Sequence, residues 1–329
     1  MEIVKNITVP TGNILITQGE HGLLECLSIG DYGKEANLKA DFLGLTKDIH
    51  GVENNLPLLP LEKKWVVTIS SQYGCSMGCT FCDVPKVGPG RNATFRDLLT
   101  QVALATSLHP EIQSTERLNL HYARMGEPTF NRDVIYSALV LSGIYSTDGW
   151  GFHPVVSTMM PRRNIQLKTF IKDWMHLKNN ILNGNAGLQV SVNTTDYKKR
   201  KEMFNDEACT LSQIANILGP LVVKGRKIAL NIALTDAHVD AKLLASMFDP
   251  GRCLIKITPM HLTTSCQDNK LFTGTKSDDY GYSSYYPYQR VEEELKEAGF
   301  DVIVFIPSMD EDSSRITCGN AILSDKEEL

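Results

Sequence analysis

From residue 65 onward, short apolar runs alternate with stretches in which apolar residues recur at helical spacing. The apolar runs span residues 65–70, 118–122, 154–157, 188–192, 228–234 and 254–258. The helical stretches between them span residues 95–108, 132–144, 166–177, 211–218 and 240–247. Because parallel strands need long crossover connections, this alternation predicts a parallel sheet with helices packed outside it. Six such units fit an α/β fold of the open, partial (β/α)6 barrel type.

The segments on either side of this pattern are less regular. Residues 12–17 and 23–29 are strand-like, and residues 47–64 have the Asn and Pro content of a linker. Beyond the sixth strand, the expected elements are a polar, Tyr-rich loop (263–286), a helix (287–299) and a strand (301–306). The predicted units are a β-rich N-terminal extension with its linker (1–62), the core barrel (63–262) and a C-terminal segment (263–329).

The composition is that of an ordinary globular protein. Of 329 residues, 42% are hydrophobic and 22% are charged, which excludes a disordered or collagen-like chain. No apolar run approaches the ~20 residues of a membrane span. Residues 1–10 lack the features of a signal peptide, so a cytoplasmic protein is expected. The net charge of −5 argues against tight nonspecific binding to nucleic acid but allows a local basic patch.

Three of the eight cysteines, Cys75, Cys79 and Cys82, fall within eight residues just after the first predicted strand. A secreted disulfide framework is a short, cysteine-dense chain, so a metal site is the better explanation. Three thiolates at this spacing can ligate three irons of a [4Fe–4S] cluster and leave the fourth iron open. A structural zinc site normally needs four closed ligands, and neither a second cysteine pair nor a nearby histidine is present.

The pattern C-x3-C-x2-C, with the aromatic Phe81 before the last cysteine, resembles the radical S-adenosylmethionine (SAM) superfamily. This resemblance implies a partial barrel, SAM bound at the open iron, and its cleavage by the reduced cluster to a 5′-deoxyadenosyl radical. It also implies an electron donor such as a flavodoxin or ferredoxin.

Polar groups that follow the predicted strands are expected at one end of the sheet, where ligands gather in parallel α/β folds. Gly126-Glu127-Pro128 resembles the superfamily's GEP element, which holds the ammonium group of SAM. The residues expected to contact SAM are Gly126, Glu127, Ser157, Ser191, Val192, Asn193 and His261.

A closer resemblance, to the RlmN/Cfr family of RNA adenine methylases, extends over residues 70–320. It is carried, in order, by Ser70-Ser-Gln-Tyr-Gly-Cys75, Met125-Gly-Glu-Pro-Thr-Phe-Asn131, Val156-Ser-Thr158 and Thr317-Cys-Gly-Asn320. The resemblance implies that Cys318 accepts a methyl group from SAM and passes its carbon to an RNA adenine. A sulfur suits this role because it can accept a methyl group from a sulfonium and later leave. Leu23-Leu24-Glu25 resembles the family's strand before the barrel, which implies Glu25 as the proton acceptor.

Several features depart from that family. Thr68 stands where the family has the cysteine that resolves the protein–RNA intermediate, and Asn193 and His261 replace a His and an Asn of the SAM pocket. The first sixty residues are too short for the helical RNA-binding extension, and residues 309–312 are acidic where a basic segment is expected. Cys266, after the sixth strand, is the best substitute for the resolving cysteine.

Three functions remain open. The first is an RlmN/Cfr-like methylase that uses Cys318, with RNA as a possible substrate. The second keeps the radical chemistry without methylation and abstracts hydrogen from a small molecule or peptide. The third is a noncatalytic metal- or RNA-binding relative, against which the cluster cysteines and the GEP element count. Basic residues at 161–163 and 198–201 are candidates for phosphate contacts, although such runs are more often solvated faces.

Overall fold

The structure is a computed structural model that describes residues 1–49, 57–147, 149–273, 276–278, 281–283, 288–308, 311, 313–316 and 320–324. In this part of the chain, the main sheet has eleven strands in the order β1-β2-β3-β5-β8-β9-β10-β11-β12-β15-β4. Their bounds are β1 Glu2–Val9, β2 Gly12–Gly19, β3 Gly22–Ile29, β4 Leu38–Lys39, β5 Trp65–Ile69, β8 Leu118–Tyr122, β9 Phe152–Thr158, β10 Gly187–Ser191, β11 Ile228–Leu234, β12 Cys253–Pro259 and β15 Asp301–Phe305.

The strands from β5 to β15 in this order are parallel. Antiparallel β1, β2 and β3 extend one edge of the sheet, and antiparallel β4 extends the other. The predicted α/β fold with a large parallel sheet is therefore confirmed.

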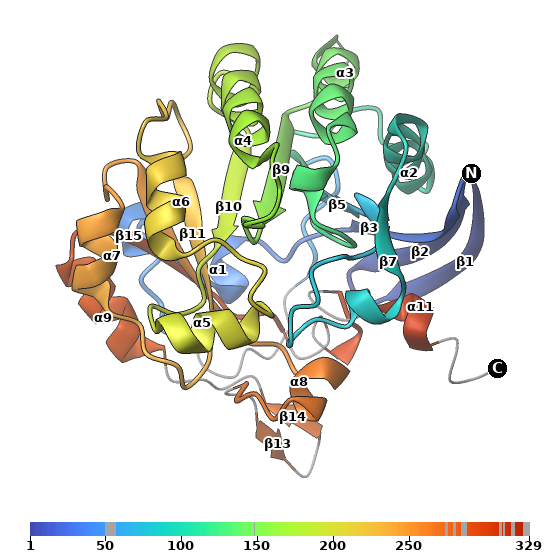
Figure 1. Ribbon diagram of the computed structural model, residues 1–329. Helices are drawn as coiled ribbons and strands as arrows, with labels where there is room; N and C mark the ends of the chain where they lie inside the picture. Colours follow the sequence, from blue (N-terminus) through green and yellow to red (C-terminus); the bar gives the residue numbers. More distant parts are fainter. Residues whose placement is uncertain are drawn as a thin grey trace.

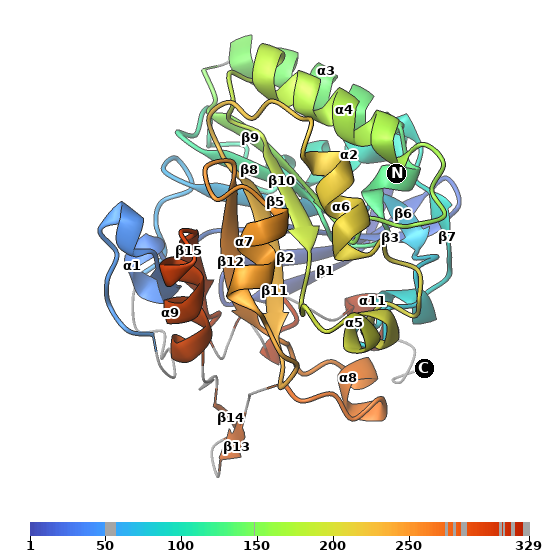
Figure 2. The ribbon, with the colours of Figure 1, turned by 60° about the vertical axis from the view of Figure 1, so that its left-hand side comes forward.

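Helices cover one face of the parallel strands (Figures 1 and 2). They are α2 Phe95–Ser107, α3 Asp133–Thr147, α4 Leu167–His176, α6 Leu211–Leu218, α7 Ala241–Met247 and α9 Gln289–Glu297. They pack on alternate strand residues such as Val67, Leu120 and Ile255, which are fully buried. Local sequence sets where two of them begin, because Thr94 and Thr210 form capping boxes at the starts of α2 and α6.

Shorter elements make up the connections. They are α1 Lys34–Asn37, η1 Asp41–Leu43, β6 Gln72–Gly74, η2 Val84–Lys86, β7 Pro89–Asn92, η3 Pro128–Phe130, η4 Leu177–Ile181, α5 Tyr197–Met203, α8 Thr264–Asp268, β13 Lys276–Asp278, β14 Gly281–Ser283 and α11 Ala321–Ser324. No described helix combines the length and the apolar character that crossing a lipid bilayer requires.

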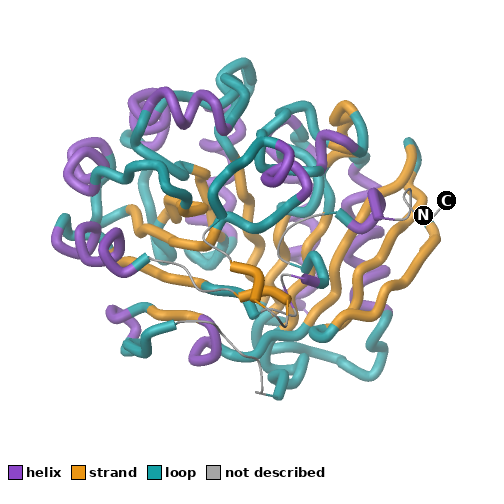
Figure 3. The backbone as a smooth tube through the Cα atoms, turned by 90° about the horizontal axis from the view of Figure 1, so that it is seen from below, coloured by secondary structure: helices purple, strands orange, loops and turns teal. Residues whose placement is uncertain are grey.

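The sheet is strongly curved, as the view from below shows (Figure 3). In the sheet, β8 and β12 are separated by β9, β10 and β11, a span of about 19 Å if the strands lay flat. Even so, the charge of Lys256 on β12 lowers the pKa of His121 on β8, and only the burial of His121 lowers that pKa more. The two strands therefore face each other across the concave face of the sheet, opposite the helices. This face is called the inner face below.

Most predicted elements lie where the pattern places them, and the main differences concern β1, α8 and the pairing of β3. β8 and β11 match the predicted strands at 118–122 and 228–234 to the residue. β1 is not predicted, because its residues are mostly exposed and show no alternation. Residues 264–268 form helix α8 within the predicted loop, because the Thr263 side chain caps the Cys266 N–H. β3 pairs with β5, so the N-terminal strands join the main sheet. The three-part division of the chain stays a prediction.

Candidate functional site

The three clustered cysteines lie in the loop between β6 and η2, beyond the carboxyl end of β5. Gly74 and Gly78 carry this loop through φ angles of +76° and +57°, a region that favours glycine. The Cys82 N–H donates to the Cys79 carbonyl (3.1 Å), and all three thiols are half-buried. Burial raises the pKa of Cys75 to about 11 and of Cys82 to about 12, and the charge of Cys75 adds to the rise at Cys82. The thiols are therefore close neighbours and protonated in the metal-free protein.

This donor set is compatible with an iron–sulfur cluster. Soft thiolates select iron–sulfur clusters, copper(I) or zinc. Among the described residues, no three Cys, His, Asp or Glu side chains converge as ligands of a single ion. A [4Fe–4S] cluster places each cysteine on a different iron, so its ligands surround a cube and do not meet at one point. The described residues thus hold no preformed zinc site, whereas the cysteine loop offers three ligands to a cluster.

The cysteine loop is joined directly to the segment that follows β8. The N–H groups of Ser71 and Gln72 donate to the Met125 carbonyl (2.8 and 3.2 Å), and the Glu127 N–H donates to Gln72 Oε1 (2.9 Å). Gly126 between them has a φ of +91°, and a Cβ there would lie 2.4 Å from Gln72 Cβ. Only glycine allows this approach, so the sequence at Gly126 fixes how the two loops meet.

The Glu127 carboxylate is buried at the same edge of the sheet. Its Oε1 accepts from the N–H and hydroxyl of Thr129 (3.1 and 2.7 Å) and from the hydroxyl of Thr158 (2.7 Å). Its Oε2 accepts from the Met159 N–H (3.0 Å), and the Met159 sulfur lies 3.8 Å from Cys79 Sγ. Burial raises the pKa of Glu127, and the hydrogen bonds oppose that rise. The carboxylate therefore ties the ends of β8 and β9 together, and Oε2 retains capacity for another donor.

Two further residues expected to contact SAM end strands at this edge. Ser157, next to last in β9, is half-buried, and its hydroxyl lies 3.4 Å from Gln189 Oε1 on β10. His261 follows β12 two residues after Pro259. Both residues thus lie at the carboxyl ends of parallel strands, and their contact with SAM stays a prediction.

The segment after β10 is occupied by contacts within the protein. The Ser191 and Val192 carbonyls both accept from the buried guanidinium of Arg200 (3.0 and 2.6 Å). Asn193 has a φ of +60°, and its Oδ1 accepts from the Ala233 N–H (3.1 Å). Asn193 therefore links the ends of β10 and β11.

Glu25 on β3 lies in a buried ion pair with Arg124, which precedes the GEP segment. Its Oε2 accepts from the N–H groups of Ala321 and Ile322 (2.8 and 3.3 Å). Arg124 also donates to the carbonyls of residues 315 and 316 (2.9 and 3.3 Å). Cys318 lies outside the described residues. It is two residues from Ile316 and two from Asn320, so the Glu25–Arg124 pair holds the chain on both sides of it.

The structure also places the residues that depart from the family. Thr68 on β5 pairs in register with His121 on the inner face, and its hydroxyl replaces the expected thiol there. Cys266 is buried in α8, and its thiol lies 3.7 Å from the Phe81 carbonyl of the cysteine loop. The structure therefore brings Cys266 beside the cysteine loop, whereas Cys26 points away from Glu25, toward the Gln101 carbonyl of α2.

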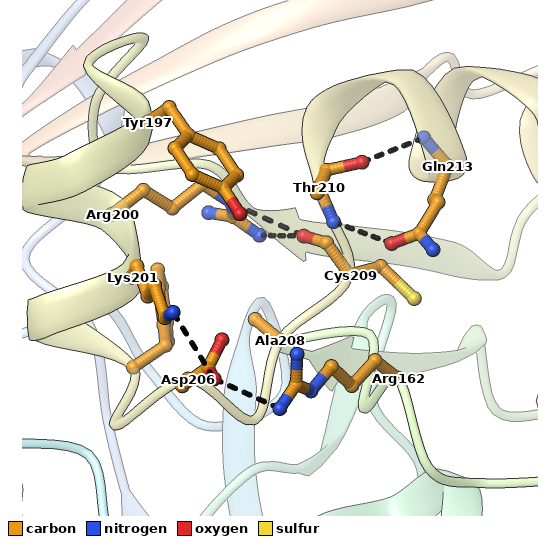
Figure 4. A pocket seen from close by; sticks show the side chains of 10 residues that line it. Arg162, Tyr197, Arg200, Lys201, Asp206, Ala208, Cys209, Thr210 and Gln213 are labelled. Carbon is orange, nitrogen blue, oxygen red and sulfur yellow. Dashed lines mark hydrogen bonds and ion pairs between the residues drawn. The ribbon is translucent and has the colours of Figure 1, made fainter.

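A pocket of about 240 Å³ beside α5 is lined by Arg162, Tyr197, Arg200, Lys201, Phe204, Asp206, Ala208, Cys209, Thr210 and Gln213 (Figure 4). It contains cations from both basic runs that are candidates for phosphate contacts. Arg162 and Lys201 both pair with Asp206 (2.9 and 3.4 Å). Arg200 donates to backbone carbonyls, including that of Cys209. These cations are thus already paired within the protein.

Comparison with known proteins agrees with the motifs. No family model matches the chain. The chain is 27% identical over 212 residues to a probable RNA methyltransferase of Sorangium cellulosum, covering 61% of this chain and 49% of that protein. It is 26% identical over 232 residues to a probable dual-specificity RNA methyltransferase RlmN of Aquifex aeolicus, covering 68% and 62%. A shorter match, to RlmN of Halorhodospira halophila, is 36% identical over 34% of this chain and 27% of that protein.

The chain resembles the RlmN RNA methyltransferases. This confirms the resemblance that the motifs predict, although the matched part covers less than two thirds of each of these relatives. Among solved structures, a mutant of spore photoproduct lyase with a dinucleoside spore photoproduct matches at a TM-score of 0.45 and 13% identity, covering 73% of this chain and 76% of that one. Similarity this distant carries no weight for function.

Proposed function

We propose that the chain is a radical SAM enzyme built on a partial (β/α)6 barrel, with Cys75, Cys79 and Cys82 as the ligands of a [4Fe–4S] cluster. The observation that carries this proposal is the hydrogen-bonded contact between the cysteine loop and the Gly126 segment at one sheet edge. The similarity to RlmN proteins and the curvature of the sheet support it. When bound, the cluster and SAM supply a 5′-deoxyadenosyl radical.

The protein's own groups bind and orient the cofactor in this proposal. Glu127 Oε2 and the Gly126 carbonyl accept hydrogen bonds from the ammonium of SAM, because Oε2 has spare capacity and a glycine leaves its carbonyl exposed. Ser157 and the segment 191–193 are the proposed contacts to the ribose and carboxylate of SAM, and His261 is a further proposed residue of the pocket. The Arg200 contacts fix that segment in place.

Within this class we propose methyl transfer through Cys318, with RNA as substrate and a flavodoxin or ferredoxin as electron donor. The thiolate accepts CH3 from the SAM sulfonium, which forms one S–C bond, breaks another and releases S-adenosylhomocysteine. Support comes from the relatives, which are named RNA methyltransferases, and from the ion pair that holds both flanks of Cys318. Glu25 accepts a proton in this route only after the C-terminal segment releases its carboxylate. Cys266 is the proposed resolving thiol.

A second candidate function, direct hydrogen abstraction from a small molecule, is favoured by Thr68. A hydroxyl at this inner-face position cannot form the disulfide that would resolve a protein–RNA thioether. In this case Cys318 is not methylated, and the inner face takes the substrate.

The cluster is tested by anaerobic purification after co-expression with iron–sulfur assembly factors, followed by iron analysis and assay of 5′-deoxyadenosine. Cys79→Ala should lose both iron and deoxyadenosine formation. Cys253→Ala is the matched control, since Cys253 is a buried cysteine at the amino end of β12. Iron and activity retained by Cys79→Ala would contradict the proposal.

Methyl transfer is tested by the mass of the Cys318 peptide. A gain of about 14 Da, one CH2, together with loss of methylation but not of SAM cleavage in Cys318→Ala, supports the covalent route. An unmodified peptide from protein that forms deoxyadenosine would favour the second function.

A further inference from the structure

The inner face of the sheet is unusually polar for the interior of an α/β fold. Alternate residues of each strand pack under the helices, so the residues between them point to the inner face. Those with polar side chains include Thr68, Asn119, His121, His153, Ser157, Gln189, Ser191, Asn231, Lys256 and Thr258, with Asp301, which pairs with Lys227, at the start of β15. The pairing register of the strands places several of them side by side, since Ser191 pairs with Asn231 and Asn231 pairs with Lys256.

Among the described residues, more cations than carboxylates gather on this face. Lys256 is partly buried, and its Nζ lies 5.2 Å from the centroid of the Phe305 ring. Among the described residues it has no carboxylate partner. After burial, Arg226 and Lys64 are the charges that lower its pKa to about 8. The same cations, with Arg117, lower the pKa of His121.

The neighbouring cations are only partly neutralised. Lys64 pairs with Asp31 (2.7 Å). Arg117 donates to Asn119 Oδ1 (3.0 Å), and Arg226 donates to a backbone carbonyl at residue 185 (3.2 Å). Neither guanidinium pairs with a carboxylate in the described part of the chain. Uncompensated cations in a buried setting cost free energy, so their clustering calls for an anion.

Unpaired polar atoms mark the same place. His153 Nδ1 and Asn231 Oδ1 are buried and have no hydrogen-bond partner among the described residues. Asn231 adjoins Lys256 in register, and its amide can present either an oxygen or an NH2 group. Arg226 lies over the start of β10, because a Cβ at Gly187 would stand 3.3 Å from its Cζ. Buried polar groups are normally paired, so these atoms point to an absent ligand.

We propose that the inner face binds the carboxylate or phosphate group of a small acidic molecule other than SAM. Lys256 and Arg226 supply the charge, and Asn231 and His153 supply hydrogen bonds. These groups lie on the concave face of the curved sheet (Figure 3), which suits a small molecule rather than a folded macromolecule. The proposed anion site does not depend on the cluster, so it stands apart from the proposed function. If the second candidate function holds, the small acidic molecule bound here would be its substrate.

The test is anion-dependent thermal stabilisation of the full-length chain. Inorganic phosphate and succinate are compared with chloride at equal ionic strength, since a ligand that binds only the folded state raises its stability by RT ln(1 + [L]/Kd). We expect stabilisation by one of the two anions. Lys256→Met should weaken its binding at least about tenfold, the loss of one charged hydrogen bond. Lys172→Met, on the exposed side of α4, is the matched control and should bind as the wild type does.

Two results would overturn the proposal. One is the absence of anion-dependent stabilisation, or equal stabilisation of Lys256→Met and wild type. The other is a parallel loss of S-adenosylhomocysteine binding in Lys256→Met, which would assign the cations to the cofactor. Arg226→Gln provides a second variant in case Lys256→Met does not fold. Because the anion-stabilisation measurements need no cluster, a failure to bind iron would count against the proposed function alone.

Discussion

The ion pair between Glu25 and Arg124 provides the sharpest test of how the C-terminal segment is held. Glu25 is 0% exposed, and the pair joins β3, the loop after β8 and the flanks of Cys318. Arg124→Met keeps an unbranched apolar chain of similar length but leaves the carboxylate buried without its cation. Removing one partner of a buried ion pair costs about 3–5 kcal/mol. The lost bonds to the carbonyls of residues 315 and 316 add about 1 kcal/mol each. We therefore expect a loss near the upper end of that range.

The assay is urea denaturation, with stability taken from the midpoint and the slope. Arg132→Met is the control, because Arg132 forms an exposed ion pair with Asp173 and such pairs contribute less than about 1 kcal/mol. The double variant Glu25→Gln/Arg124→Met should be more stable than Arg124→Met, since a neutral amide costs less to bury.

A local measurement separates this role from a general loss of stability. The amides of Ala321 and Ile322 donate to Glu25, so their hydrogen exchange should accelerate most in Arg124→Met. A cost below about 1 kcal/mol with unchanged exchange at these amides would refute the role assigned to the pair.

The sequence predicts the elements whose pattern is local. β8 and β11 have sharp boundaries because each is a short apolar run between helical stretches. β1 is not predicted because, in the described part of the chain, it pairs only with β2 and stays exposed on the sheet edge. α8 escapes because a helix of five residues depends on its Thr263 cap rather than on periodicity.

In the candidate site too, contiguous motifs are predicted from the sequence and contacts between distant segments are not. The cysteine loop and the GEP segment are each contiguous in sequence, so their chemistry is visible before folding. Arg124 is missed because its partner Glu25 is 99 residues away and no local spacing signals the pair. The inner-face cations are missed because they belong to segments far apart in the sequence, and only the curvature of the sheet brings Lys256 to His121.

Three further predictions follow from single contacts. Gly126→Ala should destabilise the protein by at least about 1–3 kcal/mol, since its φ of +91° and the nearby Gln72 exclude a Cβ; an unchanged urea midpoint would contradict this. Thr94→Ala, which removes the α2 capping box with Asp97, should cost about 1 kcal/mol by thermal unfolding, and no change would be the contrary result. The pKa of His121 is lowered to about 3 by burial and by nearby cations, so the folded protein keeps it neutral while the unfolded chain protonates it near pH 6.5. Stability should therefore fall as pH drops from 6.5 toward 3, by up to about 1.4 kcal/mol per pH unit. His121→Asn should flatten this slope, and an unaltered pH profile of unfolding would contradict the assignment.

The placement of cations separates the two substrate classes. An RNA methylase gains affinity from phosphate contacts made by accessible Lys and Arg side chains. Here Arg162 and Arg163 pair with carboxylates of the segment that follows α5, and Arg200 is buried against backbone carbonyls. On the inner face, Lys256, Arg117 and Arg226 have no carboxylate partner among the described residues. The charges of these two basic runs therefore offer little to RNA phosphates, which is a point in favour of the second candidate function. RNA affinity that falls steeply with salt concentration, as the release of several counterions requires, would reverse that conclusion. An RNA affinity that hardly changes with salt would agree with it.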